Sequence, residues 1–248
     1  MNTSNYKSII NLTIVLLIFY CSSLFVLIPI FLFNIDTKTC SDTVLNTLRI
    51  IPNVAQAILL IILYRKTLKT DFKDFIKNFG NYSDIALKYW ILGFIAMVVS
   101  NKIIISLFPI ELAANEQGVR EIIQSVPFIA FFSICIFAPI SEELIFRKAF
   151  KDCFKEKWTF ILISGFVFGF LHVIGSFKSL YDLFYIIPYS SLGIAFAYIY
   201  YKTNNIFSSI FVHCMHNTIL VILNILLSGV ILLWTNLELK KTMILQKS

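Results

Sequence analysis

The sequence has few charged residues for its length. Only 14% of its 248 residues are Asp, Glu, Lys or Arg, whereas 58% are hydrophobic. A soluble globule of this size needs more polar side chains than this to cover its surface. The composition therefore excludes an ordinary soluble protein and indicates a chain whose natural solvent is lipid.

Cysteines are also few, and they are scattered. The chain has five, none of them in a CxxC pair, and four lie in or beside apolar segments. A disulfide framework or a thiolate zinc site would need cysteines at regular or clustered spacings. We predict neither.

Two further patterns are missing from the sequence. No aromatic and basic residues combine into a platform for nucleic acid, so we expect no nucleic-acid partner in spite of the net charge of +7. No internal repeat is visible either. Its absence argues against a small transporter that would use buried acids and histidines as a proton relay.

Apolar stretches long enough to cross a bilayer recur along the whole chain. A helix needs roughly 20 apolar residues to cross the hydrocarbon, and a helix satisfies its own backbone there. The fold class that we predict is all-α, a polytopic bundle of seven or eight spans in which residues 1–248 form one integral membrane domain. The seven expected spans lie at about 9–33, 44–64, 87–108, 128–149, 158–177, 182–201 and 206–234.

The two ends of this bundle leave different questions. Lys7 and the apolar run 9–33 resemble a secretory signal, but the run exceeds the roughly 7 to 15 residues of a signal core and no small-residue cleavage site follows, so we expect a retained span. The segment 206–234 fits one tilted helix or a helix plus a re-entrant piece. An eighth crossing stays open.

Basic residues alternate between connectors. The connectors 65–84 and 150–157 are rich in Lys and Arg, whereas 109–127 has only Arg120. The positive-inside rule places the two basic connectors and the amino terminus in the cytoplasm. We expect a multi-pass protein of the bacterial cytoplasmic membrane, with 109–127 as a plain extracytoplasmic loop. An amphipathic surface helix there is the alternative.

The acids and histidines inside the apolar segments gather in three spans. Glu142 and Glu143 are the only two of the fourteen carboxylates within a span, and all three histidines lie in apolar segments. Such groups are costly at membrane depth unless they are paired or hydrated. Their confinement to three helices predicts a functional site.

The segment PISEELIFRKAF carries both glutamates. Glu143 and Arg147 are four residues apart, on one helix face, in the order that favours an ion pair. Glu142 points about 100° away and can face a cavity while Arg147 holds its neighbour. Pro139 cannot donate a backbone hydrogen bond and is expected to kink or open the helix beside Glu142.

The segment GFVFGFLHV supplies the next histidine. Glu142 and His172 are each fifteen residues from Lys157, so an antiparallel hairpin that turns there brings them to similar depth. A carboxylate and an imidazole that face one another can hold and deprotonate water. Gly165 and Gly169 are spaced to allow close contact with another helix.

The segment FVHCMHNT supplies the third group. His213 and Asn217 are one turn apart on a common face, and both can donate hydrogen bonds to a developing oxyanion. His216 lies about 60° from His213 and faces either the same cavity or a neighbouring helix. Each of these groups taken singly has a structural explanation, as a salt bridge or as interhelical hydrogen bonding.

Three motifs in this order resemble the CAAX-protease and bacteriocin-processing family, also called the Abi family. The resemblance covers roughly residues 125–225, which we take as the catalytic core. The motifs are EExxxR (Glu142, Glu143, Arg147), FxxxH (Phe168, His172) and HxxxN (His213, Asn217).

The resemblance implies an intramembrane endopeptidase, a hydrolase that cuts a membrane-associated protein or peptide. By motif position, Glu142 and His172 would activate water. His213 and Asn217 would form the oxyanion hole. Glu143 and Arg147 would support the site. The alternative is a non-catalytic bacteriocin immunity or interaction membrane protein with the same fold.

The resemblance leaves the metal open. Family members are often labelled metalloproteases, yet the prenyl-protein enzyme is understood as a glutamate-dependent protease without a bound metal. We favour no cofactor, and the sequence has no HExxH motif. If zinc were bound, its ligands would be Glu142, His172 and His213. The expected partners are the lipid bilayer and a membrane-associated substrate, whose identity the sequence does not reveal.

Overall fold

The computed structural model describes residues 3–108 and 113–245, and this part of the chain is helical without a strand. Seven of its helical segments are long and apolar enough to cross a membrane. The predicted all-α polytopic fold is therefore confirmed. The seven segments are Tyr6–Leu32, Asp42–Leu63, Phe79–Leu107, Pro127–Cys153, Lys157–Ile174, Leu180–Thr203 and Ile206–Leu227.

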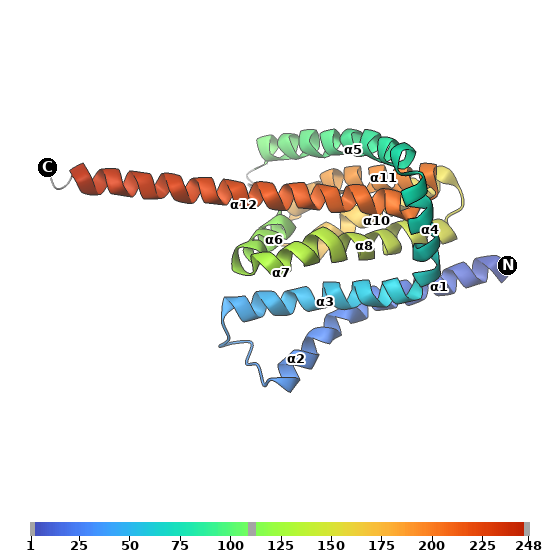
Figure 1. Ribbon diagram of the computed structural model, residues 1–248, viewed down its shortest axis with the longest axis horizontal. Coiled ribbons are helices and arrows are strands. Elements are labelled where there is room, and N and C mark those ends of the chain that lie inside the picture. The colour runs from blue at the N-terminus through green and yellow to red at the C-terminus, as the bar shows by residue number, and fades with distance from the viewer. Residues whose placement is uncertain (1–2, 109–112, 246–248) are drawn as a thin grey trace.

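The elements follow one another with short connections (Figure 1). In the first half they are α1 (Thr3–Cys21), the 3-10 helix η1 (Ser22–Val26), α2 (Leu27–Leu32), α3 (Asp42–Leu63), α4 (Arg65–Lys77), α5 (Phe79–Leu107) and α6 (Ala114–Ser125). The fourth span joins α7 (Pro127–Phe132), the π-helix η2 (Ser133–Phe137), α8 (Ala138–Glu142), the π-helix η3 (Glu143–Ala149) and α9 (Phe150–Cys153). After it come α10 (Lys157–Ile174), the 3-10 helix η4 (Leu180–Tyr185), α11 (Ile186–Thr203) and α12 (Ile206–Leu245).

The last helix, α12, is one continuous helix of 40 residues. Figure 1 shows that it runs through the bundle and projects beyond it. Of the two arrangements expected for 206–234, the structure has the single helix.

The fourth span widens around Pro139. Ala138 N–H donates to Ser133 O, five residues back, which is the π-helical register. In that register residue 139 would donate to Ile134 O, but proline has no N–H, so this carbonyl is left for another donor. Backbone angles stay right-handed helical at Ala138 and at Glu143. The opening expected beside Pro139 therefore takes the form of two π-helical segments, η2 before α8 and η3 after it.

Glycines let α10 and α11 pack closely. A Cβ on Gly165 would lie 2.7 Å from Ile194 N, and one on Gly169 would lie 2.6 Å from Ser190 N. Real Cβ atoms do not approach backbone nitrogen so closely, so only glycine fits at both positions. The close helix contact predicted from the glycine spacing is confirmed, and it places His172 beside α11.

Two short helices lie outside the spans. α4 crosses the end of the bundle, and α6 lies near the opposite end beside α7 (Figure 1). The expectation of a plain loop over 109–127 is wrong for Ala114–Ser125, which is α6; residues 109–112 lie outside the described part. α6 forms because it alternates apolar residues with polar ones at helical spacing, and Ile123 is its buried contact.

Candidate active site

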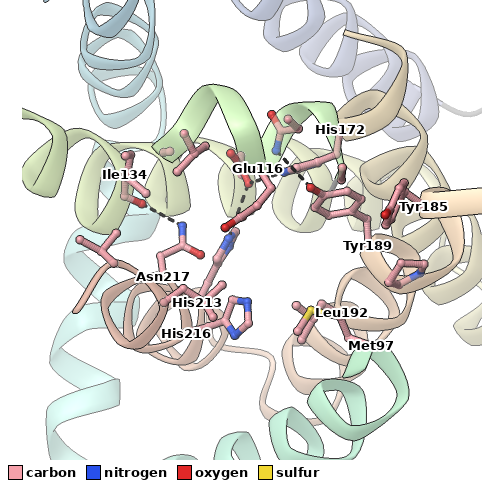
Figure 2. A pocket seen from close by; sticks show the side chains of 18 of the residues that line it. Met97, Glu116, Ile134, His172, Tyr185, Tyr189, Leu192, His213, His216 and Asn217 are labelled. Carbon is pink, nitrogen blue, oxygen red and sulfur yellow. Dashed lines mark hydrogen bonds and ion pairs between the residues drawn. The ribbon is translucent and has the colours of Figure 1, made fainter. Parts of the chain in front are cut away.

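A cavity of about 470 Å³ lies between the helices of the bundle. Its walls include side chains from α5, α6, α8, α10, α11 and α12. Figure 2 shows His213, His216 and Asn217 on one side of this cavity and His172 with Tyr189 on the other. Of the six predicted site residues, the four that line it are Glu142, His172, His213 and Asn217.

The two other predicted residues form a buried ion pair behind the cavity. Arg147 Nε lies 3.1 Å from Glu143 Oε2, and both side chains are 0% exposed. Arg147 also donates to Ser164 Oγ at 2.8 Å, and its guanidinium lies 4.8 Å from the ring centre of Phe168. The ion pair predicted from the four-residue spacing is confirmed. An isolated charge would be untenable here, so the pairing is what permits both groups to be buried.

Glu142 has the opposite environment. Its side chain is 20% exposed and lines the cavity. Its Oε2 atom is buried and has no hydrogen-bond partner among the described residues. The Nε2 atoms of His172 and His213 lie 3.8 and 3.6 Å from that oxygen, too far for direct hydrogen bonds. A carboxylate oxygen thus faces two imidazole nitrogens across a gap.

His172 is held in one orientation by its own helix and by α11. Its Nδ1 lies 2.8 Å from Phe168 O. A carbonyl only accepts, so Nδ1 carries the hydrogen and, in the neutral ring, Nε2 presents a lone pair toward Glu142. The ring lies between Phe168, at 4.3 Å between ring centres, and Tyr189, at 5.0 Å.

His213 and Asn217 are both already engaged in hydrogen bonds. His213 Nδ1 lies 3.0 Å from Glu143 Oε1. Asn217 Nδ2 donates to Ile134 O at 2.8 Å (Figure 2). Ile134 O is the carbonyl that Pro139 leaves without its backbone donor. Each side chain keeps one further polar group for the cavity. In Asn217 it is the second N–H of the amide, and in His213 it is Nε2 of the imidazole.

His216 lines the same cavity as His213. Its ring also meets two aromatic rings of α5, Phe94 at 5.9 Å and Trp90 at 6.4 Å between ring centres. Both arrangements that the sequence left open for His216 are therefore present together.

No three His, Cys, Asp or Glu side chains in the described part of the chain are placed so that they could hold a metal ion. The three candidate zinc ligands named from the sequence, Glu142, His172 and His213, are thus not arranged around a common metal position in this structure.

Several cavity and support residues were not found from the sequence. Ser164 bonds Arg147, and Tyr189 stacks on His172. α6 contributes Asn115 and Glu116 to the cavity, and Asn115 Nδ2 lies 3.4 Å from the Tyr189 hydroxyl. Ser164 could have been suspected as a polar residue next to Gly165 inside an apolar span. The other three have no local signal.

Comparison with protein families gives a match to part of the chain. Residues 124–219 match the family described as type II CAAX prenyl endopeptidase Rce1-like. This range contains all three motifs and the whole fourth span, Pro127–Cys153. No solved structure matches the chain significantly.

Curated relatives match over part of their lengths. The chain is 37% identical over 114 residues to "Putative membrane peptidase YdiL" of Bacillus subtilis, which is 45% of this chain and 43% of that protein. It is 24% identical over 149 residues to "UPF0177 protein YxdF" of Lactococcus lactis, 58% of this chain and 80% of that protein. A second Lactococcus lactis protein, "UPF0177 protein YaiF", is 35% identical over 108 residues, 43% of this chain and 46% of that protein.

The chain therefore covers less than half the length of YdiL and YaiF. The family match and the name of YdiL support membrane peptidase activity in general. They confirm the resemblance that the three motifs predicted: over residues 124–219 this multi-pass membrane protein is similar to the Rce1-like type II CAAX prenyl endopeptidases.

Proposed function

We propose that the protein is an intramembrane endopeptidase of the bacterial cytoplasmic membrane that hydrolyses a peptide bond of a membrane-associated protein or peptide. One observation carries the proposal. The buried Oε2 atom of Glu142 has no hydrogen-bond partner among the described residues, and it faces His172 Nε2 and His213 Nε2 across gaps of 3.8 and 3.6 Å. A buried carboxylate oxygen without a hydrogen-bond partner lowers the stability of the fold, and such groups are typical of active sites.

A water molecule between Glu142 and His172 would satisfy both groups. Polar atoms separated by more than about 3.5 Å are commonly bridged by water. The water would donate one hydrogen to the Glu142 carboxylate and the other to His172 Nε2, which carries a lone pair because Nδ1 donates to Phe168 O. Two acceptors on one water raise the electron density on its oxygen, which then faces the cavity as the nucleophile.

The reaction would proceed in two steps. The water oxygen bonds to the carbonyl carbon of the substrate while its proton passes to Glu142, and the carbonyl oxygen becomes an oxyanion. The carbon–nitrogen bond then breaks, and the leaving amine takes the proton from Glu142. This sequence regenerates the carboxylate and needs no other reactant.

The oxyanion would be stabilised from α12. His213 would keep the hydrogen of Nδ1 on Glu143 Oε1, and a hydrogen on Nε2 would point into the cavity toward the oxyanion. Asn217 would contribute its second N–H. The bond from its first N–H to Ile134 O fixes the direction of the amide.

The test is hydrolysis by purified protein in neutral detergent. We would offer internally quenched peptides with a farnesylated cysteine three residues from the carboxyl end, the same peptides without the lipid, and peptides with an apolar membrane anchor. We expect cleavage of at least one class, with loss of cleavage in Glu142→Gln and His172→Ala.

The matched control is Glu121→Gln on α6. This glutamate makes an exposed ion pair with Arg49 and lies outside the cavity lining. We expect it to keep the wild-type rate. If Glu142→Gln, folded and produced normally, cleaves as fast as Glu121→Gln, the proposal is wrong.

Metal dependence has its own measurement. We expect a chelator, followed by its removal, to leave the rate unchanged. Loss of activity with chelator, restored specifically by zinc, would replace the metal-free mechanism with a zinc mechanism at the same residues.

A further inference from the structure

The helix α4 carries a row of lysines without ion-pair partners. Lys66, Lys69, Lys73 and Lys77 recur at intervals of three and four residues, so they share one side of the helix. All four side chains are exposed, and within the described part of the chain none forms an ion pair. We call these four residues the basic row.

The two acids of α4 point away from the basic row. Asp71 Oδ2 accepts from Ile206 N–H at 3.1 Å. Asp74 Oδ2 accepts from the Tyr82 hydroxyl at 2.7 Å and from Asn205 Nδ2 at 2.9 Å. These bonds lower the pKa of the Asp74 carboxyl below its ordinary value, so it stays ionised. The acids fasten α4 to α5 and to the beginning of α12, which leaves the outer side of α4 positive.

Apolar side chains border the basic row. Phe72 is 50% exposed and Ile76 is 59% exposed, each three residues after a lysine of the row. α4 crosses the end of the bundle instead of running along it (Figure 1). A short helix with basic residues beside exposed apolar ones, at the end of a membrane bundle, suits the zone between headgroups and acyl chains.

The other basic connector is different. Lys148 lies 2.7 Å from Asp152, and Lys151 donates to Asn204 Oδ1 at 2.8 Å. Lys157 lies over the ring of Trp158 at 4.3 Å. These three lysines are engaged within the protein, whereas Lys155 is exposed and forms no ion pair among the described residues. A general excess of lysine on one side of the membrane therefore does not explain why the basic row stays unengaged.

We propose that the basic row, with Phe72 and Ile76, is a binding site for an anionic phospholipid. The headgroup phosphate would lie against the lysines, and the acyl chains would lie along the two apolar side chains. A lysine near an anionic lipid surface changes the binding constant roughly fivefold. Because α4 is fastened at Asn205 and Ile206, the bound lipid would sit beside the start of the helix that carries His213.

The experiment measures lipid binding directly and needs no proteolysis. The full chain in neutral detergent is titrated with dihexanoyl phosphatidylglycerol, with dihexanoyl phosphatidylcholine and with glycerol 3-phosphate at one ionic strength. Retained lipid is counted by native mass spectrometry. The test variant is Lys69→Gln with Lys73→Gln. The control removes the same charge from exposed lysines elsewhere, Lys38→Gln with Lys102→Gln.

We expect wild type and the control pair to bind phosphatidylglycerol in preference to phosphatidylcholine, and the test pair to bind it at least tenfold more weakly. Unfolding temperatures of both pairs should match wild type. An equal loss in the two pairs would show a general charge effect and overturn the site. No preference for phosphatidylglycerol in wild type would also overturn it, as would competition by glycerol 3-phosphate at equal concentration, which would indicate a site for free phosphate.

Discussion

Glu142 and Glu143 are neighbours in sequence, yet their surroundings are opposite. Glu143 is enclosed by Arg147 on its own helix and by His213 of α12, so both of its oxygens have partners. Glu142 lines the cavity, and one of its oxygens has no partner among the described residues. Successive residues of a helix point about 100° apart, so one turn can serve two environments.

The difference separates support from chemistry. Both oxygens of Glu143 are engaged, and Ser164 accepts from Arg147 and in turn donates to Phe146 O at 2.6 Å. Such a network holds the fourth span against α10 and α12. The Glu142 side is unsaturated and therefore open to water and substrate. The experiments that follow test this division, from the largest expected effect to the smallest.

Glu142→Gln should separate activity from stability most strongly. Replacing the carboxylate removes the proton acceptor and should lower the rate of peptide hydrolysis by roughly 10² to 10⁴. The unfolding temperature should stay the same or rise, because a neutral amide replaces a carboxylate with an unpaired oxygen. Initial rates and thermal unfolding of one preparation measure both. A large drop in stability would show that Glu142 is structural and contradict the division.

Arg147→Met should behave in the reverse way. It removes the arginine cation beside the buried Glu143 carboxylate and leaves only the His213 contact, at a cost of about 3–5 kcal/mol in stability. Denaturant unfolding in mixed micelles measures the loss. The double variant Glu143→Gln with Arg147→Met should recover much of it, since the buried carboxylate is removed together with its arginine partner. No recovery in the double variant would mean that the pair contributes through packing alone.

Ser164→Ala should weaken the support region by a smaller amount. It removes a hydrogen bond to a charged group, worth about 1.5–3 kcal/mol. Ser100→Ala is the matched control, because that hydroxyl bonds only carbonyls of its own helix in the described structure, Ala96 O and Met97 O. Equal unfolding free energies for the two variants would remove Ser164 from the network.

Tyr189→Leu tests whether the orientation of His172 in the cavity depends on the Tyr189 ring. Tyr189 stacks on His172, so losing its ring should lower kcat up to about tenfold while KM changes less. Tyr189→Phe keeps the ring and should stay within about twofold of wild type. If the phenylalanine variant falls as far as the leucine variant, the hydroxyl that Asn115 contacts is the important group instead.

Much of this site follows from spacing along single helices. The Glu143–Arg147 pair and the shared face of His213 and Asn217 require only helix geometry, which holds wherever the helix sits. Contacts between different helices were harder to predict from the sequence. Asn217 donates to Ile134 O because Pro139 and a π-helical turn leave that carbonyl free, and the sequence shows the proline without the register. One N–H of Asn217, a side chain predicted to donate to the oxyanion, is therefore already bonded to the protein backbone.

The sequence by itself determined the membrane class, the seven helical spans and which residues could carry chemistry, because apolar length and helical periodicity are local properties. Only the tertiary structure decided how the spans turn toward one another. It set the gap between Glu142 and two imidazoles, brought α6 to the cavity wall and turned the acids of α4 inward. Rotation of one helix against another depends on packing between distant residues, which no single segment encodes.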